Sequence, residues 1–543
     1  MFANNSTLDD SDAPPPPTLN PNPTRVLPPP IISSRRVCKA LSKLDVGKAF
    51  GPDGIPPRVL RECASELAPV YARLFRLILK SKLFPPSWKH SYVQPVPKKG
   101  DRSNPSNYRP ISLTCTISKV FETLLNSHFL KHLEKHSLLS DHQYGFRQAR
   151  STGDLLSYIT HLWSSSLRDF GESFVVALDI SKAFDRVWHL SLLSKLPSYG
   201  FSTSICSLIQ SYLSNRSIAV TIDGSVSSTH NINSGVPQGS VLSPTLFLLF
   251  INDLLSCTAN TIHSFADDST LHSSTSFQSP PSPHIRTITR DNSISSINKD
   301  LERIASWGEA NLVNFNKSKT QFQIVSLSSL PVDAAITFQD SIIQPTSSIN
   351  MLGVQINSSL SWREHIVQIS KTASKQMGIL FRCRPFFTSE QLLQVYKGLI
   401  RPRLEYCCHV WGGSPSTPIL DRVESKAVRL INSPTLTNSL PSLKCRRDVA
   451  SLALFYRYYF GQCSRELTTC VPPARVWIRP TRRAQVSHPY CVDLGHPRID
   501  RYAKSFFHST GLLWNTLPSS DFPNSYNLSS FKCRVYRHLR EID

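Results

Sequence analysis

Apolar residues recur at three- and four-residue spacing in two early stretches of the chain, which is the spacing of one face of a helix. The first stretch begins at Val37, and the second runs from Leu67 to Ile78. Glycine and proline in the segment 51–54 mark a turn between these predicted helices. Residues 92–97 then alternate in the manner of a short strand.

The middle of the chain carries the pattern of a buried sheet. Residues 174–178 form a continuous apolar run that ends on Asp179, as a central strand does. Residues 217–234 predict a hairpin around Asp223-Gly224. Pro244 then marks the start of a helix through an apolar segment.

Three other segments differ in kind. Residues 11–30 contain nine prolines and can bury little, so we expect a disordered lead-in over residues 1–36. The Ser/Pro-rich residues 273–297 are expected to be a flexible insertion. From Ile366 to about Ile431 the apolar spacing is mostly helical.

The charge of the chain is strongly basic and unevenly distributed. With 60 Lys and Arg against 38 Asp and Glu, the net charge is +22 over 543 residues, a length that suits two to four packed units. Residues 371–543 hold 26 basic and 11 acidic side chains, or +15 of that total. Such an excess indicates a polyanion partner, nucleic acid before an anionic membrane.

Two classes of protein are not expected from the composition. The apolar run 246–251 is too short to span a bilayer, so we expect no membrane partner. The 13 cysteines include no Cys-x-x-Cys pair, which favours reduced thiols in an intracellular protein over disulfides or a zinc site.

Acidic residues at two predicted strand ends point to phosphoryl chemistry. Asp179 ends a buried strand, and Asp267-Asp268 stands between two β-runs, where a hairpin tip is expected. Such acids are costly unless cations neutralise them, and divalent metals take oxygen ligands. Two metal ions can catalyse nucleotidyl transfer. Taken singly, each acid has a structural alternative: Asp9-Asp10 is another such pair, and Asp185 is read as a turn cap.

Several motifs, in a fixed order along the sequence, favour the metal-binding interpretation of these acids over the structural one. From about Val37 to its end, the sequence resembles the reverse transcriptases of non-LTR (LINE-type) retrotransposons of the jockey-like group. The motifs that carry the resemblance are Gly51-Pro52-Asp53-Gly54-Ile55, Tyr108-Arg109-Pro110-Ile111-Ser112-Leu113, Gln143-Tyr144-Gly145-Phe146-Arg147, Ala177-Leu178-Asp179-Ile180, Pro237-Gln238-Gly239, Phe265-Ala266-Asp267-Asp268, Met351-Leu352-Gly353-Val354 and Arg401-Pro402-Arg403-Leu404-Glu405-Tyr406.

The resemblance implies an α+β right-hand polymerase with fingers, palm and thumb. The implied division is a lead-in over 1–36, a helical extension over 37–91, fingers and palm over 92–355, a helical thumb over 356–435 and a basic C-terminal region over 436–543. The implied cofactor is a pair of Mg²⁺ ions, with Mn²⁺ as a substitute. The implied metal ligands are Asp179, Asp267, Asp268 and the Ile180 carbonyl.

The resemblance also assigns roles around the metals. Phe184 matches the aromatic gate that selects dNTPs against NTPs, and Lys319 matches the lysine that protonates pyrophosphate, with Lys317 as the alternative. The other implied dNTP-binding residues are Lys98 (or Lys99), Arg109, Gln238 and Gly239. The implied primer grip is Leu352 and Gly353. The expected nucleic-acid contacts are Arg147, Arg401, Arg403, Arg446 and Arg447, with Arg482 and Arg483 as further candidates; scattered solvated arginines are the alternative for each.

The function predicted from this resemblance is RNA-directed DNA polymerisation, with an RNA template, a DNA primer or target and dNTPs as partners, in the nucleus. Phe265 replaces the tyrosine that is usual in the family. The 36 residues before Val37 cannot hold the endonuclease that the family carries, so we expect either the polymerase portion of an element or a 5′-truncated copy. A silent relic that binds RNA without copying it is the alternative function. A viral RNA-dependent RNA polymerase is a weaker one, because Ala266-Asp267-Asp268 with Phe184 favours DNA synthesis.

Overall fold

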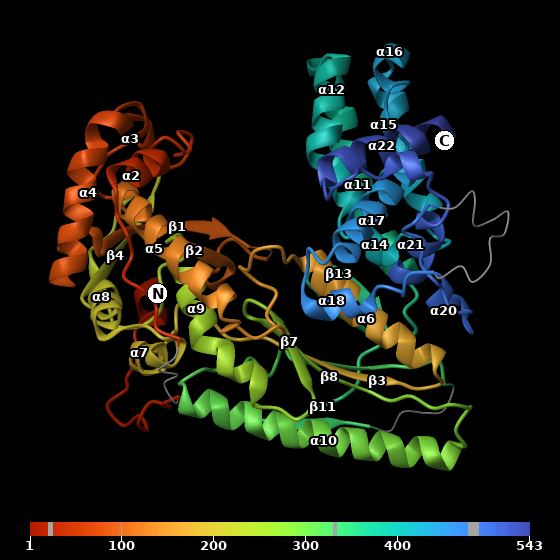
Figure 1. Cartoon of the computed structure of the whole chain (residues 1–543), viewed down its shortest axis with the longest axis horizontal. Coiled ribbons are helices and arrows are strands. Elements are labelled where there is room, and N and C mark those ends of the chain that lie inside the picture. The colour runs from red at the N-terminus through yellow and green to blue at the C-terminus, as the bar shows by residue number, and fades with distance from the viewer. Residues whose placement is uncertain (20–24, 99, 329–333, 476–487, 543) are drawn as a thin grey trace. The chain divides into compact units, whose positions relative to one another are not determined.

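The computed structural model describes residues 1–19, 25–98, 100–328, 334–475 and 488–542 (Figure 1). The fold mixes helix and sheet, at 50% helical and 13% strand, as expected for an α+β chain. Two compact units are built from alternating segments of the sequence. Unit 1 comprises Met1–Phe146, Asp179–Ala259 and Asp300–Ser318, and unit 2 comprises Arg147–Leu178, Asn260–Lys299 and Lys319–Asp543. The five-part linear division therefore stays a prediction.

Unit 1 is built on a sheet in which the strand predicted over 92–97 is central. This strand, β1 (His90–Pro97), pairs antiparallel with β2 (Tyr108–Leu113) and parallel with β4 (Arg216–Ile222). β4 also pairs with β5 (Ser225–Val226) and β6 (His230–Ile232). The hairpin predicted at Asp223-Gly224 is confirmed, and both residues have positive φ, 49° and 85°.

Unit 1 also contains helices, among them the three that were predicted from Val37, over residues 67–78 and from Pro244. They are α1 (Phe2–Asn5), α2 (Ser34–Leu41), α3 (Pro57–Glu62), α4 (Ala64–Ser81), α5 (Thr116–Lys135), α7 (His189–Lys195), α8 (Thr203–Leu213) and α9 (Ser243–Ile251). The buried face of α4 differs from the apolar stripe in its sequence. Ala68, Ala72 and Phe75 are buried, whereas Val70 and Leu77 are exposed. The small alanines allow the close packing of α2 against α4.

The first residues of the expected lead-in, before its prolines, contact the rest of unit 1. Asn5 and Leu8 are buried, and the carbonyl of Ser6 accepts the backbone N–H groups of Asn233 and Ser234 at 3.2 and 3.1 Å. The side chain of Asn233 also exchanges two hydrogen bonds with the backbone of Leu8. Backbone groups make most of these contacts, so the segment docks with few apolar side chains.

Unit 2 contains a four-stranded antiparallel sheet in the order β7-β8-β3-β9. Its strands are β7 (Thr261–Phe265), β8 (Asp268–Ser274), β3 (Ser173–Leu178) and β9 (Gln321–Val325). The predicted strand over 174–178 is thus confirmed at the centre of the sheet, with Phe174, Val175 and Val176 fully buried. Helix α6 (Thr152–Arg168) packs against β3, β7 and β8 (Figure 1).

The predicted flexible insertion over 273–297 is mostly helix. After β8, helix α10 (Pro283–Ala310) runs as one long rod along the lower edge of Figure 1. Its Ile297 is fully buried, and its Arg290 binds the buried carboxylate of Glu172 through two hydrogen bonds of 2.8 Å. The prolines stand before the helix or at its first position, where they do not break it. The expectation of a flexible segment was therefore wrong for residues 283–297.

Among the residues that the structure describes, the remainder of unit 2 consists of two short hairpins and a helical region, which confirms the helical pattern expected after Ile366. The hairpins are β10 (Ile336–Phe338) with β11 (Ser341–Ile343) and β12 (Ser348–Met351) with β13 (Val354–Asn357). The helices are α11 (Arg363–Cys383), α12 (Ser389–Val395), α13 (Arg401–Glu405), α14 (Cys408–Trp411), α15 (Pro418–Ile431), α16 (Pro434–Thr437), α17 (Leu443–Tyr459), α18 (Arg465–Cys470), α20 (Asp500–Ala503), α21 (Phe506–Trp514) and α22 (Leu528–Ile542).

Two expectations from the composition can be compared with these elements. In the part of the chain that the structure describes, none of the 13 cysteines is paired in a disulfide. Within the described ranges, every helix is too short or too polar to cross a lipid bilayer.

Candidate functional site

Asp267 stands at the tip of a tight hairpin in unit 2. Phe265 at the end of β7 pairs with Asp268 at the start of β8, so Ala266 and Asp267 alone form the loop. Ala266 has a φ of 59°, which a two-residue turn of this hand requires. One residue pair below the tip, the hydroxyls of Ser264 and Ser269 lie 2.7 Å apart and are buried. The turn therefore presents two adjacent carboxylates from a rigid base.

Strand β3 ends beside this hairpin. Its last residue, Leu178, lies opposite Ser269 of β8, and Asp179 follows Leu178 in the chain. In unit 1, the carbonyl of Asp179 accepts the backbone N–H of Asn316 at 2.8 Å, and Ile180 bridges Phe315. This pairing fixes the backbone that carries Asp179.

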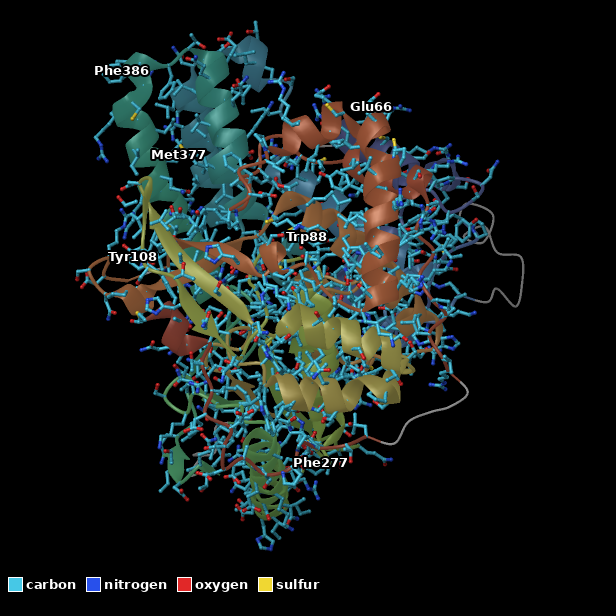
Figure 2. All side chains as sticks on the ribbon, turned by 90° about the vertical axis from the view of Figure 1, so that its left-hand side faces the viewer. Glu66, Trp88, Tyr108, Phe277, Met377 and Phe386 are labelled. Carbon is cyan, nitrogen blue, oxygen red and sulfur yellow. The ribbon has the colours of Figure 1, made fainter. Side chains whose placement is uncertain are left out.

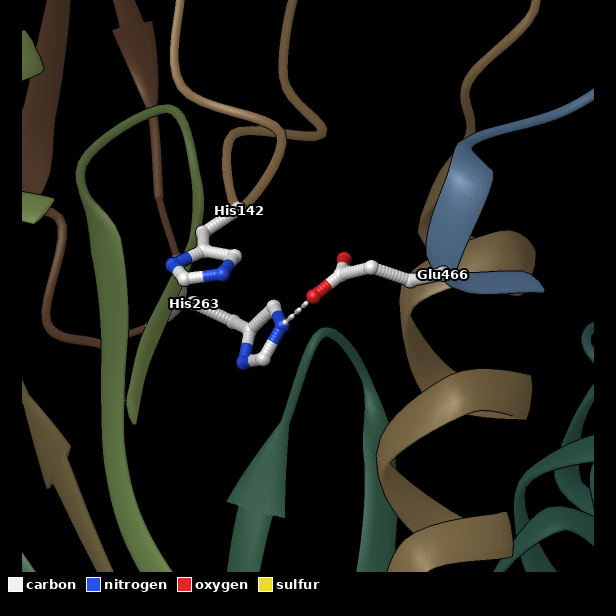
Figure 3. Close-up of side chains that lie close together, drawn as sticks. All are labelled: His142, His263 and Glu466. Carbon is white, nitrogen blue, oxygen red and sulfur yellow. Dashed lines mark hydrogen bonds and ion pairs between the residues drawn. The ribbon is translucent and has the colours of Figure 1, made fainter. Parts of the chain in front are cut away.

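A buried chain of polar side chains supports the hairpin from its other end. His263 of β7 and His272 of β8 face each other, with Nδ1 of His263 2.9 Å from Nε2 of His272. The opposite nitrogen, Nε2 of His263, lies 2.9 Å from a carboxylate oxygen of Glu466 on α18 (Figure 3). Both imidazoles are at most 5% exposed. The C-terminal helical region is therefore bonded directly to the strand that leads to Asp267.

Phe184 lies in an aromatic cluster of unit 1. Its ring stacks on Phe247 of α9, with centroids 4.5 Å apart and planes 17° apart. It also meets the ring of Phe146 edge-on at 5.9 Å. Phe184 is half-buried, and the position of its ring is set by packing against these two rings.

The segment 237–239 is fastened to two other parts of unit 1. The carbonyl of Gln238 accepts the backbone N–H of Ser112 at 2.6 Å. Gly239 has a φ of 133°, and a Cβ there would lie 2.4 Å from the carbonyl oxygen of Ser112. Glycine is thus required by conformation and by space. The side-chain amide of Gln238 donates to a carboxylate oxygen of Asp185 at 2.8 Å.

Asp185 is more than the turn cap that its sequence suggested. Burial raises the pKa of this carboxyl, and the hydrogen bond from Gln238 and the charges of Lys182 and Lys98 partly oppose that rise. The carboxylate borders a small cavity of about 30 Å³ that Gln238 and Phe2 also line. Asp185 therefore links the segment after Asp179 with the segment 237–239.

The expected triphosphate-binding cations lie at the end of the β1–β2 hairpin. Arg109 pairs with Val96 across the two strands, and Lys98 directly follows β1. Both side chains are exposed, so phosphate oxygens can reach them. The alternative Lys99 lies outside the described residues. In unit 2, Lys319 is exposed two residues before β9, and the choice between it and Lys317 stays open.

The turn Leu352-Gly353 joins β12 and β13 with positive φ at both positions, 49° and 83°. The hydroxyl of Tyr406 donates to the carbonyl of Leu352 at 2.9 Å. A Cβ at Gly353 would lie 3.4 Å from the ring of Tyr406. The predicted primer-grip turn is therefore held by the segment that follows α13.

Comparison with known proteins agrees with this geometry. Residues 96–356 match the family described as reverse transcriptase (RNA-dependent DNA polymerase). The matched residues therefore form a reverse transcriptase domain, and the chain is similar to the reverse transcriptases of non-LTR retrotransposons. Over 412 residues it is 27% identical to the probable RNA-directed DNA polymerase from transposon X-element of Drosophila melanogaster, covering 73% of this chain and 43% of that protein.

Two more relatives are similar to parts of this chain. The RNA-directed DNA polymerase from mobile element jockey of Drosophila funebris is 27% identical over 78% of this chain and 46% of its own length. The Pol polyprotein from the type-1 retrotransposable element R2 of Popillia japonica is 35% identical over 32% of this chain and 24% of its own length. The chain thus spans less than half the length of these curated relatives.

Two of the arginines expected to bind nucleic acid are bonded to carboxylates within the chain. Arg446 binds both oxygens of Glu405, one of them at 2.9 Å. Arg447 is 5% exposed and donates twice to one oxygen of Asp421, each time at 3.2 Å. Their charges are largely used inside the protein. Arg482 and Arg483 lie outside the described residues.

Arg401, Arg403 and Arg147 differ in accessibility. Arg403 is exposed on α13 and Arg401 is half-buried at its start, so both remain candidates for phosphate contacts. Arg147 is 7% exposed, at the start of the segment that leads into α6. A phosphate contact by Arg147 would need a ligand that reaches a largely covered side chain.

Sequence reasoning missed two residues that bind the motifs. Glu122 of α5 is fully buried and accepts hydrogen bonds from residues 240–242, just after Gln238-Gly239. Glu466 reaches the hairpin strand from a segment 203 residues away. Glu122 left no clear local signal, because its neighbours one helical turn away include the polar Ser118 and Asn126. The pairing of Glu466 with His263 left no local signal.

Proposed function

We propose that the chain is an RNA-directed DNA polymerase that extends a DNA 3′ end on an RNA template. The observation that carries the proposal is the two-residue hairpin with Asp267 at its tip, in a reverse transcriptase domain. The proposal extends to an α+β right hand, in which the sheet of unit 2 belongs to the palm and the helices from α11 to α15 belong to the thumb. The basic charge of residues 371–543 supports a nucleic-acid partner.

The residues present fit a divalent metal centre. Asp267 and Asp268 offer adjacent carboxylates at the rigid tip, and Asp179 follows the strand paired beside it. Carboxylate and carbonyl oxygens are the ligands of hard cations such as Mg²⁺, with Mn²⁺ as a substitute. In the proposal these acids and the Ile180 carbonyl hold the metal, which supplies activation of the 3′-hydroxyl and charge neutralisation on the transferred phosphoryl group.

The chain's own side chains would orient the incoming nucleotide. Phe184, fixed by its stack on Phe247, would block a ribose 2′-hydroxyl and so select dNTPs. Lys98 and Arg109, exposed at the β1–β2 hairpin, would bind the triphosphate oxygens. The segment with Gln238 and Gly239 would support the base and sugar, and Lys319 would deliver a proton to the leaving pyrophosphate.

The nucleic acids would be held in unit 2. The turn Leu352-Gly353, braced by Tyr406, is the proposed primer grip, and Arg401 and Arg403 are the proposed backbone contacts. Contacts of this kind are electrostatic, so binding should weaken steeply as salt rises. A chromosomal DNA primer would require action in the nucleus.

Primer extension tests the proposal. Poly(rA) with an oligo(dT) primer, dTTP and Mg²⁺ is offered to the wild type, to Asp267→Asn and to Asp223→Asn. The last variant is a matched control, because Asp223 also stands in a two-residue hairpin turn, in unit 1, where asparagine tolerates the positive φ. We expect extension by the wild type and Asp223→Asn, and none by Asp267→Asn.

The same assay separates the alternative function. A folded wild type that binds the RNA but extends no primer, with either Mg²⁺ or Mn²⁺, would contradict the polymerase and favour a relic that binds RNA. Extension that persists in Asp267→Asn would contradict the proposed metal centre while leaving a polymerase in place.

A further inference from the structure

Glu122 is a carboxylate in the interior of unit 1 that belongs to none of the motifs. It lies on α5 with a fully buried side chain. One helical turn earlier, the hydroxyl of Ser118 donates to its Oε1 at 2.8 Å. A charge in such a place is unfavourable unless several donors compensate it. The identity of those donors therefore indicates what the residue does.

Three donors to the other oxygen come from one short segment. The backbone N–H groups of Val241 and Leu242 point at Oε2, at 2.8 and 3.3 Å, and the hydroxyl of Ser240 donates to the same oxygen. Leu242 is the N-cap of α9, so the carboxylate also lies at the positive end of that helix. Glu122 thereby binds the N–H groups that lie just before the first turn of α9, while the hydroxyl of Ser240 accepts the N–H of Ser243 at 3.4 Å.

The hydrogen bonds around Glu122 extend to a third helix. The hydroxyl of Tyr212 on α8 lies 2.7 Å from that of Ser240. Ser240 gives its proton to Glu122, so Tyr212 is the donor in this pair. Burial raises the pKa of Tyr212 to about 12, and the charge of Glu122 adds to the rise, which keeps the phenol protonated. Tyr212, Ser240 and Glu122 thus form an ordered chain of hydrogen bonds.

The middle member of these hydrogen bonds, Ser240, directly follows Gly239 in the sequence. On the other side of the loop, Ser112 donates to the carbonyl of Gln238 and approaches Gly239 too closely for any side chain there. The segment 238–242 is therefore fixed between β2 and α5, and its two fixed ends leave little freedom to Gln238 and Gly239.

We propose that Glu122 is a positioning residue for the segment 238–242. It holds Gln238 and Gly239 in the position in which they contact an incoming dNTP. The inference rests on the proposed polymerase function, and Glu122 itself touches neither substrate nor metal. Loss of the charge should therefore impair the binding of dNTP more than the chemical step, because the acids that hold the metal are elsewhere in the sequence.

Single-nucleotide extension with Glu122→Gln, Tyr212→Phe and Glu66→Gln tests this. Glutamine keeps the size of Glu122 and one acceptor oxygen, whereas Tyr212→Phe removes one hydroxyl at the far end of the chain. Glu66 is the matched control, an exposed glutamate on α4 of the same unit (Figure 2). For Glu122→Gln we expect the KM for dTTP to rise about tenfold or more with kcat within about threefold of wild type. Tyr212→Phe should shift KM in the same direction by less, and Glu66→Gln should leave it unchanged.

A second measurement reports on the loop without any turnover. Hydrogen–deuterium exchange at the amides of Val241 and Leu242 should be faster in Glu122→Gln than in wild type, and unchanged in Glu66→Gln. Wild-type exchange at these amides in a folded Glu122→Gln would overturn the inference, as would a KM equal to wild type. If Glu122→Gln fails to fold, Tyr212→Phe with unaltered exchange and KM overturns it. If the wild type extends no primer but Glu122→Gln still shows faster exchange at Val241 and Leu242, the polymerase function is refuted. The role of Glu122 in holding the segment 238–242 is then still supported.

Discussion

The hydroxyl of Tyr406 donates a hydrogen bond to the carbonyl of Leu352, 54 residues earlier, at 2.9 Å. It thereby connects the end of α13 to the turn of the β12–β13 hairpin. Leu352 is held at a φ of 49°, which a leucine adopts at some cost. An external donor to its carbonyl helps to keep the turn in this conformation. The proposed primer grip and the helical region that follows α11 are thus mechanically joined.

Removal of this bond should weaken the hold on the primer. Tyr406→Phe keeps the ring against Gly353 and removes a neutral hydrogen bond worth about 1 kcal/mol, so the apparent KM for primer–template should rise about fivefold. The KM for dTTP should change little. Tyr526→Phe, another partly exposed tyrosine of unit 2, is the control. An unchanged primer KM in Tyr406→Phe would show that the turn keeps its position without this donor.

Phe184 should decide which sugar the enzyme accepts. Its ring is fixed between Phe247 and Phe146, so a smaller side chain opens space at a defined place. With Phe184→Val, we expect UTP incorporation relative to dTTP to increase on the order of tenfold, because a hydroxyl that was excluded by contact can now enter. Competition between the two nucleotides in one reaction measures this ratio. Phe146→Leu removes a neighbour of the Phe184 ring and should change this ratio less. An equal change would show that the whole aromatic cluster, and not Phe184 alone, selects the sugar.

Much of the fold was predictable because its signals are local. The apolar run before Asp179 forms a central strand, and Asp223-Gly224 forms a hairpin turn. The α4 helix shows the limit of such reasoning. Its spacing was read correctly, but Val70 and Leu77 face solvent while Ala68 and Ala72 are buried, because close helix packing favours small side chains that hydropathy ranks low.

The candidate site divides in the same way. Asp267, Gln238 and Gly239 were found because they stand within contiguous motifs that specify a turn or a close approach. Glu122 and Glu466 were missed because their partners are more than 100 residues away. The side chains that carry the proposed chemistry are therefore visible in the sequence, and those that hold them in place become visible once the chain is folded.

Glu172 binds two arginines of α10, the helix that residues 283–297 form in place of the flexible insertion that we predicted, and this contact can be tested. Its carboxylate is 2% exposed and accepts from Arg290, Arg286 and Ser326. Burial by itself would raise the pKa of Glu172, but the hydrogen bonds and charges of these partners outweigh it and lower the pKa. A carboxyl whose pKa is lower in the folded state stabilises above its unfolded pKa and loses that contribution as pH falls through the folded pKa.

Glu172→Ala should therefore destabilise unit 2 by about 3–5 kcal/mol at pH 7, since it leaves the guanidinium of Arg290 buried without its partner. Chemical denaturation measures the change. The control is Glu302→Ala, at an exposed position of α10, the helix that also carries Arg290. It should change stability by less than about 0.5 kcal/mol. The double variant Glu172→Met with Arg290→Met should regain a large part of the loss; a double variant as unstable as Glu172→Ala would show that packing, not charge, dominates there.

His409 predicts how unit 2 responds to mild acid. This imidazole lies on α14, and its Nε2 is 3.2 Å from the carbonyl of Gly153 at the start of α6. Burial lowers the pKa of His409 to about 4. Between pH 6.5 and 4 the unfolded chain takes up a proton that the folded chain does not, so stability rises with pH across this window and is lost as pH falls. From pH 7 to pH 5 the cost from this one group is about 2 kcal/mol.

His409→Gln isolates that cost, because glutamine places an amide donor near the position of Nε2 and does not titrate. We expect the variant to lose about 2 kcal/mol less than wild type in urea unfolding compared between pH 7 and pH 5. His230→Gln, at an exposed position of β6 in unit 1, should follow the wild-type pH dependence. If His409→Gln also follows it, the imidazole accepts a proton in the folded chain, and the contact with Gly153 must then open between pH 7 and pH 5.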